Sequence, residues 1–261
     1  MSRALRLALL LIVAGCAYLF LAHPYWFPAG ASANSSSIDR QFKIAFCVFG
    51  ALFLLGHLVL IFVLSKKPNA NSNGSQGSWR LEVTWTLAIT LIFFWFNISG
   101  DHLWSSMMPP AKEGGQIDIE VTGAQFQWYF RYPGKDGVFG KTDVQKFARP
   151  DEGNPLGIDP SDPAGSDDIL ATSMVVPVGR TVNLHLRAQD VIHSLFIPAM
   201  RFKQDTVPGM EIHSHFTPTK IGSYEIACAE LCGMGHYRMR SVVRVVSEEE
   251  FAVWLKQHGS F

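Results

Sequence analysis

Soft metal ligands gather near the C-terminal end of the sequence. Cys228 and Cys232 are four residues apart, His236 follows after four more and Met239 after another three, while His193 lies upstream. Thiolate and thioether ligands select copper or zinc over magnesium or calcium, and the methionine favours copper. Two cysteines on one loop offer enough thiolate to bridge two copper ions, so the chemistry that we predict is electron transfer.

Other interpretations of these residues remain open. A disulfide between Cys228 and Cys232 would suit an oxidising compartment outside the cytoplasm, and a zinc site would use similar ligands. The neighbouring histidines and methionine favour copper over both. His185 lies in an alternating stretch and is interpreted as a surface histidine. His213 and His215 would share one face of a strand, which leaves open a second metal site.

The ligand cluster resembles the CuA domain of subunit II of haem-copper cytochrome c oxidases. The resemblance covers residues 190–209 and 224–239, including the stretch Phe-Lys-Gln-Asp-Thr-Val-Pro-Gly between the two groups of ligands. It implies a cupredoxin fold and a dinuclear copper centre. The implied ligands are the bridging Cys228 and Cys232, the terminal His193 and His236, the sulfur of Met239 and the backbone carbonyl of Glu230. The resemblance also implies that the free Glu230 side chain binds a magnesium ion shared with the catalytic subunit, in keeping with the oxygen ligands that hard cations prefer.

Three further residues gain roles from the same resemblance. Where many members of the family read Gly-x-Gln-Trp-x-Trp, this chain has Phe126 in place of the first tryptophan and retains Trp128. In the family the first tryptophan lies on the electron route from cytochrome c, so Phe126 departs from the usual entry point, and Trp128 is either part of that route or a packing residue. Glu82 resembles a glutamate near the entrance of a proton channel in the catalytic subunit. The alternative for Glu82 is an ordinary carboxylate at the membrane interface.

The N-terminal part of the chain predicts a membrane region. Ile44 to Leu64 is an uncharged, mainly apolar run, and about 20 such residues cross a bilayer. Val83 to Phe96 is a second apolar run, so residues 41–104 are predicted to form a two-helix transmembrane region. Residues 1–22 are either a signal peptide or an extra transmembrane helix. A lipidated N-terminus at Cys16 is a further option.

Basic residues predict how this region is oriented. Lys66, Lys67 and Arg80 flank the loop between the two predicted helices, and short loops with such residues stay in the cytoplasm. The chain after residue 104 would then lie on the periplasmic or outer face of a bacterial plasma membrane.

Residues 105–246 are predicted to form an all-β, cupredoxin-like barrel or sandwich of antiparallel strands. Short alternating segments bounded by glycine, proline or charged turns indicate the strands. They start at Ile117 and continue with Met174–Val176, Val182–Leu186, Ser194–Ile197, Ser223–Ala227 and Ser241–Val246. Residues 133–168 are rich in glycine, proline and aspartate and are interpreted as a surface insertion. Residues 247–261 are predicted to form a short helix, because Ser247 and Glu250 have the spacing of a capping box.

Together with these features, the resemblance implies the copper-bearing subunit II of a cytochrome c oxidase. It would accept electrons from a c-type cytochrome and pass them to haem in the catalytic subunit I, where oxygen is reduced to water and protons are pumped. Other oxidase subunits and membrane lipid are expected partners, and nucleic acid is not. A quinol oxidase subunit would lack the copper ligands. The alternative function is that of a membrane-tethered cupredoxin electron carrier or copper-binding protein.

Charge and cysteine spacing bear on the electron donor. Formal net charge is zero over the whole chain, but residues 1–101 carry +4 and residues 102–261 carry −4. A mildly acidic outer domain would attract a basic donor such as cytochrome c. The sequence contains no Cys-x-x-Cys-His stretch, so the donor haem is expected on another chain.

Overall fold

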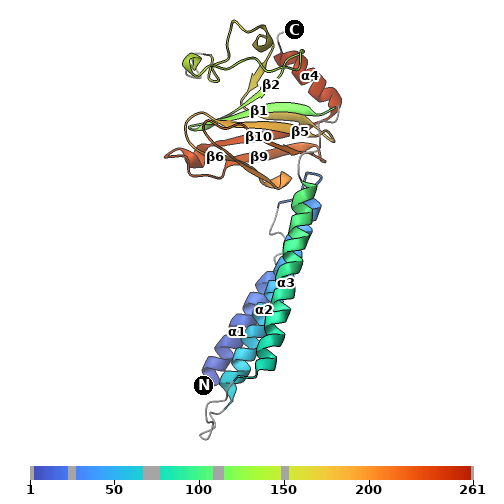
Figure 1. Cartoon of the computed structure of the whole chain (residues 1–261), viewed down its shortest axis with the longest axis vertical. Coiled ribbons are helices and arrows are strands. Elements are labelled where there is room, and N and C mark those ends of the chain that lie inside the picture. The colour runs from blue at the N-terminus through green and yellow to red at the C-terminus, as the bar shows by residue number, and fades with distance from the viewer. Residues whose placement is uncertain (1–2, 23–27, 67–76, 108–114, 148–152, 260–261) are drawn as a thin grey trace. The chain divides into compact units, whose positions relative to one another are not determined.

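The structure is a computed structural model that describes residues 3–22, 28–66, 77–107, 115–147 and 153–259. The chain divides into two compact units, one made of helices and one made mainly of strands (Figure 1). A short segment, residues 29–36, belongs to the strand unit although it precedes most of α2 in the sequence. Its Ala31 N–H donates to the carbonyl of Ala199 at 2.8 Å, and the Ala31 carbonyl accepts from Thr219 N–H at 2.8 Å.

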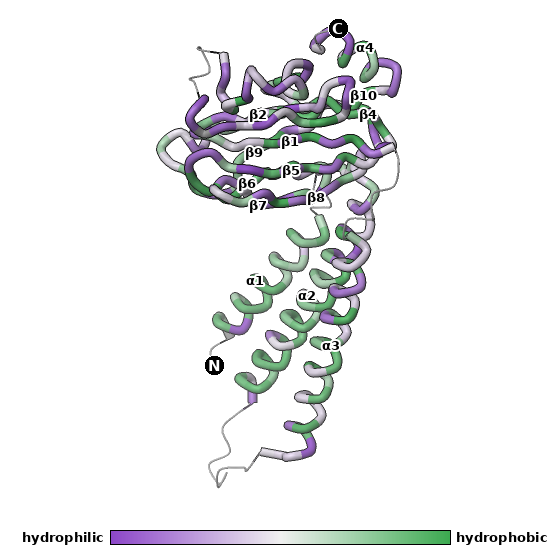
Figure 2. The backbone as a smooth tube through the Cα atoms, turned by 45° about the horizontal axis from the view of Figure 1, so that its top comes forward, coloured by the Kyte–Doolittle hydropathy of each residue, from purple (hydrophilic) through white to green (hydrophobic). Residues whose placement is uncertain are grey.

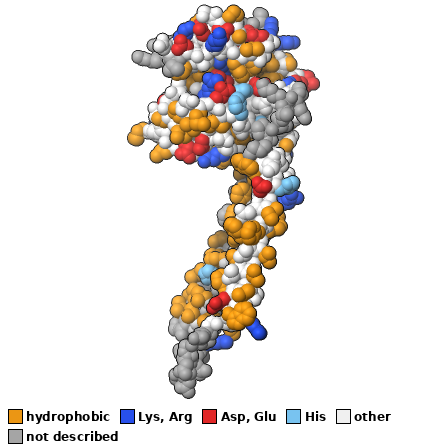
Figure 3. Space-filling view, viewed as in Figure 1, with side chains coloured by type: hydrophobic (Ala, Val, Ile, Leu, Met, Phe, Trp, Pro, Cys, Tyr) orange, Lys and Arg blue, Asp and Glu red, His pale blue; other side chains and the backbone are white. Residues whose placement is uncertain are grey.

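The helical unit contains three long apolar helices. These are α1 (Arg3–Ala22), α2 (Ser35–Ser65) and α3 (Trp79–Ser106). Each is long and apolar enough to cross a membrane. Hydrophobic residues follow one another along all three helices in the tube view (Figure 2), and hydrophobic side chains cover much of the visible helical surface in Figure 3. Contacts between α2 and α3 include a hydrogen bond from Gln41 to Ser99 at 2.9 Å.

The two predicted apolar runs lie inside α2 and α3, and both helices extend beyond them. These helix ends are expected to extend past the apolar runs, because polar residues there can continue the helical hydrogen bonds while their side chains contact water. The helix α1 lies within residues 1–22, and an apolar helix there fits both predictions made for this segment, an extra transmembrane helix and a signal peptide. Lys67, one of the three residues behind the predicted orientation, lies outside the described residues.

The strand unit consists of two five-stranded sheets, with the orders β3-β2-β1-β5-β8 and β4-β10-β9-β6-β7. The first sheet is formed by β1 (Ile117–Ala124), β2 (Gln127–Tyr132), β3 (Ile169–Ala171), β5 (Val182–Ala188) and β8 (Ile212–Phe216). The second is formed by β4 (Met174–Pro177), β6 (His193–Ile197), β7 (Phe202–Thr206), β9 (Gly222–Cys228) and β10 (Arg240–Val246). All six strands listed from the sequence are present, and the strand expected to contain His213 and His215 is β8. Strands β2, β3 and β7 were not predicted.

The expectation of a purely antiparallel arrangement was wrong. Strand β1 pairs with β5 in parallel, and β10 pairs with β4 in parallel, while the remaining pairs are antiparallel. Parallel neighbours need a long connection that returns the chain to the same end of the sheet. Here that connection between β1 and β5 includes β2, β3 and β4. The all-β class of the unit is confirmed.

One hydrophobic core fills the space between the sheets. In β5, Val182, Leu184 and Leu186 are buried, and the residues between them are not, as the two-residue period of a strand requires. Outside this core, the buried Arg131 donates to the carbonyl of Gly140 at 2.6 Å and pairs with Asp168. This guanidinium therefore links β2 to the segment between β2 and β3.

The chain ends in the helix α4 (Glu248–His258). The predicted capping box is confirmed, because the Ser247 side chain accepts from the Glu250 N–H and the Glu250 side chain accepts from the Ser247 N–H. Phe251 of this helix is buried in the core.

Candidate metal centre

Strand register places His193 beside Cys228. Strand β6 pairs with the end of β9 so that Leu195 lies opposite Cys228. Side chains two residues apart project from the same face of a strand, so His193 shares the inward face with Leu195 and Cys228. All three side chains are buried. Two rigid strands of the same sheet thus fix the first two candidate ligands.

The remaining candidate ligands lie on the loop that follows β9. The loop is closed at its base by a hydrogen bond from Cys228 N–H to the carbonyl of Met239 at 3.1 Å. It is tied to β6 by another from Ala229 N–H to the carbonyl of Ser194 at 3.0 Å. A single 3-10 turn, η5 (His236–Arg238), brings His236 back towards the cysteines.

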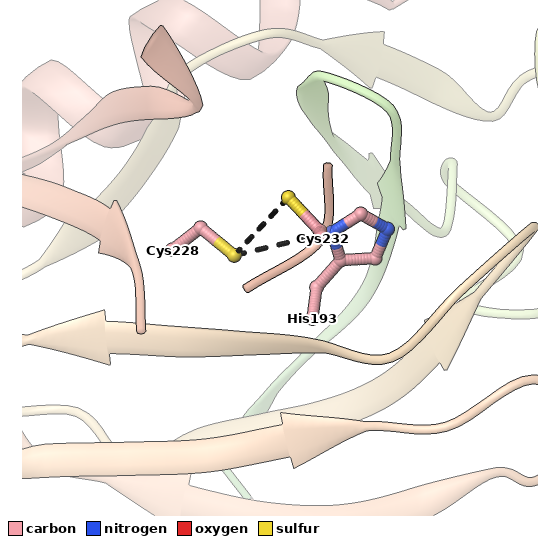
Figure 4. Close-up of side chains that lie close together, drawn as sticks. All are labelled: His193, Cys228 and Cys232. Atoms are coloured by element: carbon pink, nitrogen blue, oxygen red, sulfur yellow. Dashed lines mark hydrogen bonds between the residues drawn. The ribbon is translucent and has the colours of Figure 1, made fainter. Parts of the chain in front are cut away.

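The candidate ligand atoms form a continuous group. The Sγ atoms of Cys228 and Cys232 are 3.9 Å apart, and Cys228 Sγ lies 3.9 Å from Nδ1 of His193 (Figure 4). Cys232 Sγ lies 3.6 Å from Nδ1 of His236 and 3.8 Å from the Sδ of Met239. Both cysteines are free thiols, so the structure does not have the alternative disulfide.

These separations fit ligands that share metal ions. Metal–sulfur bonds of about 2.3 Å and metal–nitrogen bonds of about 2.0 Å put two ligands of one ion roughly 3.5–4 Å apart. The donor set combines thiolate, imidazole and thioether, which are the ligands that copper favours. The backbone carbonyl of Glu230 lies 3.2 Å from Cys228 Sγ. The residues present therefore suit copper.

The surroundings give the two thiols different acidities. Burial would raise the pKa of Cys228, but the contact with His193 and backbone hydrogen bonds outweigh it and lower that pKa. The pKa of Cys232 is raised by burial and by the charge of Cys228. The pKa of His193 is raised, because its contacts with Cys228 and Asp190 outweigh the lowering effect of burial. The site therefore stabilises one thiolate before metal binding supplies positive charge.

A carboxylate behind His193 was not predicted from the sequence. Asp190 accepts from Nε2 of His193 at 2.8 Å and from the backbone N–H groups of Gln125 and Val191, both at 2.7 Å. A metal-binding histidine commonly donates its other ring N–H to such a carboxylate, which fixes the ring's orientation. Gln125 in turn donates its side-chain N–H to the carbonyl of Cys232 at 2.5 Å. The three-residue spacing of Asp190 and His193 was the only local signal for this contact.

The two predicted electron-entry residues lie at different depths. Trp128 is fully buried, and its ring meets that of His193 edge to face with 5.9 Å between centroids. Phe126 is 37% exposed. The Phe126 ring lies against the ligand loop so closely that a Cβ on Gly235 would clash with it. Both residues therefore contact the candidate site, and only Phe126 reaches the surface.

The Glu230 side chain, His213 and His215 are not among these ligand atoms, and Glu82 belongs to the helical unit. The Glu230 side chain is exposed while its backbone carbonyl faces Cys228. Glu82 lies in the first turn of α3 and is exposed. A carboxylate at that position is favoured by the helix dipole. His213 and His215 both lie in β8, and only His213 belongs to a second group of potential ligands, formed with His185 and Glu211.

Residues 117–246 match the family model described as cytochrome C oxidase subunit II, periplasmic domain. The chain is 32% identical to the alternative cytochrome c oxidase subunit 2 of Bradyrhizobium diazoefficiens, over 99% of this chain and 93% of the relative. It is 31% identical to cytochrome c oxidase subunit 2 of Thermostichus vulcanus, over 88% of this chain and 78% of that relative.

A solved structure is also similar to this chain. The periplasmic domain of cytochrome oxidase subunit II from Bradyrhizobium japonicum is 32% identical and covers 58% of this chain and 96% of its own, with a TM-score of 0.42. The similarity to the Bradyrhizobium diazoefficiens relative over 99% of this chain and the family match over residues 117–246 support the same conclusion. The chain belongs to the cytochrome c oxidase subunit II family, whose members are subunits of an oxidoreductase complex.

Proposed function

We propose that this chain is the electron-entry subunit of its oxidase, with a dinuclear copper centre held by Cys228, Cys232, His193, His236 and Met239 and by the carbonyl of Glu230. The observation that carries the proposal is the continuous group of soft ligand atoms separated by 3.6–3.9 Å. Copper bound there would accept one electron at a time from a c-type cytochrome and release it to haem in the catalytic subunit.

The protein's own contribution is to hold the ligands still and keep water away. His193 and Met239 have no exposed surface, and Cys228 and Cys232 are also buried. His193 is fixed by its strand and by Asp190, and the loop is fixed at its base by the bond between Cys228 and Met239. Ligands locked by packing and by hydrogen bonds behind them move little when charge changes, which favours fast electron transfer.

Electrons would enter near Phe126. Its exposed edge and its contact with the ligand loop connect the surface to the candidate centre. Trp128, which is buried against His193, would form the interior part of this electron route. Residues 102–261 carry a net charge of −4, and complementary charge would speed the approach of a basic cytochrome c.

Two carboxylates of this chain would act in the assembled oxidase complex. The exposed Glu230 side chain is free to bind a magnesium ion together with the catalytic subunit I, because hard cations prefer carboxylate oxygen. Glu82 in the first turn of α3 would lie near the entrance of a proton channel in that subunit. Reduction of oxygen to water and proton pumping would take place in the partner.

The proposed location is the plasma membrane of a bacterium, with a multi-pass chain and the copper domain on the periplasmic face. Three helices of spanning length support membrane insertion. Lys66 and Arg80 at the ends of the connection between α2 and α3 support its placement in the cytoplasm. The relatives come from bacteria, and the matching family model describes a periplasmic domain.

The proposal is tested by mixing the purified oxidase complex with reduced cytochrome c and following cytochrome oxidation in a stopped-flow instrument. Cys228→Ser should abolish rapid oxidation. Cys47→Ser removes a free cysteine of α2 and should leave the rate unchanged. Rapid oxidation by a Cys228→Ser complex that retains its full haem content would contradict the proposal.

A further inference from the structure

A second group of metal-binding side chains lies on the outer face of the sheet that contains β5 and β8. His185 of β5 pairs directly with His213 of β8. Their rings meet edge to face, with 4.8 Å between centroids. Glu211 directly precedes β8. The histidines therefore project from the same polar face, on paired strands that fix their spacing.

The ligand atoms of this group converge. Oε1 of Glu211 lies 3.0 Å from Nδ1 of His185 and 3.6 Å from Nε2 of His213. One ligand atom from each residue lies within 4.8 Å of the others. Nitrogen and oxygen ligands about 2.0–2.2 Å from a tetrahedral zinc ion are roughly 3.3–3.6 Å apart. Small side-chain rotations would therefore bring all three onto one ion.

Surrounding charges orient these ligands. The other ring nitrogen of His185, Nε2, lies 3.2 Å from Oδ1 of Asp118. Donation from Nε2 to Asp118 leaves the Nδ1 lone pair directed towards Glu211, which is the arrangement found behind metal-binding histidines. Arg187 pairs with the second oxygen of Glu211, Oε2, so Oε1 is the oxygen left for a metal.

The composition of the group indicates which metal it would bind. Two imidazoles and a carboxylate, with no sulfur, suit zinc-class divalent ions and differ from the sulfur-rich set at Cys228. The His213 side chain is 62% exposed and that of Glu211 is 36% exposed. This exposure gives water access to an open coordination position. Histidines lie beside acidic and basic side chains on the surface of the strand unit in Figure 3.

We propose that His185, Glu211 and His213 form a second metal site that binds one zinc-class divalent ion, with Asp118 as the residue that positions His185. The site is independent of copper binding at Cys228 and Cys232. A metal bound there would link β5 to Glu211, the residue before β8. Strand β5 is followed by the turn that contains Asp190, and His193 is the first residue of β6. The alternative is a metal-free cross-strand network in which the His185 ring contacts Asp118 and Glu211.

The test uses the full-length, copper-loaded protein in detergent. Samples are dialysed against Zn²⁺ at increasing concentration, and zinc and copper per chain are counted by mass spectrometry. The wild type should bind one more zinc than the His213→Ala variant, with equal copper in both. His215→Ala is the matched control, because His215 lies on the same face of β8 but outside the group. This control should bind zinc as the wild type does.

A second variant tests the positioning role. Asp118→Asn keeps an acceptor for Nε2 of His185 but removes its charge, and loss of such a partner typically weakens metal affinity about 10–100-fold. The proposal is overturned if His213→Ala and wild type bind the same amount of zinc, or if His215→Ala loses as much as His213→Ala. Because copper is counted in the same samples, failure here is distinguishable from failure of the copper proposal.

Discussion

Asp190 accepts from one ring nitrogen of His193 at 2.8 Å while the other, Nδ1, lies 3.9 Å from the sulfur of Cys228. The two contacts assign opposite tasks to the two nitrogens of one buried ring. Because the carboxylate holds the Nε2 proton, the Nδ1 lone pair is directed into the cluster of sulfur atoms.

Asp190→Ala should therefore weaken copper binding without removing a ligand. We expect a loss of affinity of about 10–100-fold, measured by competition with a copper chelator. Asp136→Ala is the control. Asp136 is exposed and lies in a turn, where its carboxylate accepts from the Val138 N–H. Equal copper affinity of the Asp190→Ala variant and the wild type would contradict the assigned role.

Gly123 leaves the space that the His193 ring occupies. A Cβ at this position would lie 2.9 Å from Cδ2 of His193 and 3.1 Å from Cζ3 of Trp128, both in buried side chains. Gly123→Ala should displace His193, reduce copper retention and lower stability by about 1–3 kcal/mol, as overpacking does. Thermal unfolding and copper content of the purified chain measure both effects. Gly100→Ala, where a Cβ would meet nothing within 4 Å, should change neither.

The buried guanidinium of Arg131 predicts a large effect on stability that is separate from the metal site. It pairs with Glu120 at 3.3 Å and with Asp168, and its side chain is 1% exposed. Arg131→Met would remove the guanidinium from both carboxylates, while Glu120 would keep its pair with Arg187 at 3.5 Å. Breaking a buried pair in this way costs about 3–5 kcal/mol. Denaturant unfolding followed by tryptophan fluorescence measures this change. The exposed Arg244 offers the control Arg244→Met, which should alter stability by less than about 0.5 kcal/mol.

Part of this architecture was predictable because the signals are local. The ligands from Cys228 to Met239 lie in one short stretch, and the apolar runs of α2 and α3 are continuous. Strand β5 alternates clearly between buried and outward residues, so its two-residue period identified it. In each of these cases neighbouring residues carry the whole pattern.

The features that escaped prediction depend on distant contacts. Strand β2 is buried at nearly every position, so it lacks the alternation that marks a half-exposed strand. The parallel pairing of β1 with β5 depends on the path of the chain through three other strands. Gln125 reaches Asp190 from 65 residues away, and no local pattern encodes that contact. The second metal group likewise needs the β5–β8 register to bring His185 to His213.

The two thiols should titrate separately in the metal-free protein. The pKa of Cys228 is lowered and that of Cys232 is raised, and an interacting pair loses its protons in two steps. As pH rises, the first thiolate should form below the ordinary thiol range and the second above it. Ultraviolet thiolate absorbance measures both steps, with the Cys228→Ser/Cys232→Ser double variant subtracted to remove Cys16 and Cys47. A single step at the ordinary thiol pKa would contradict this prediction.

The most direct test of the central claim is to count copper in the purified full-length chain and record its electron paramagnetic resonance spectrum. The proposal predicts two copper ions per chain that share one unpaired electron, and the loss of that signal in Cys232→Ser but not in Cys47→Ser. A single copper with a mononuclear signal, or no copper together with a disulfide between Cys228 and Cys232, would contradict it.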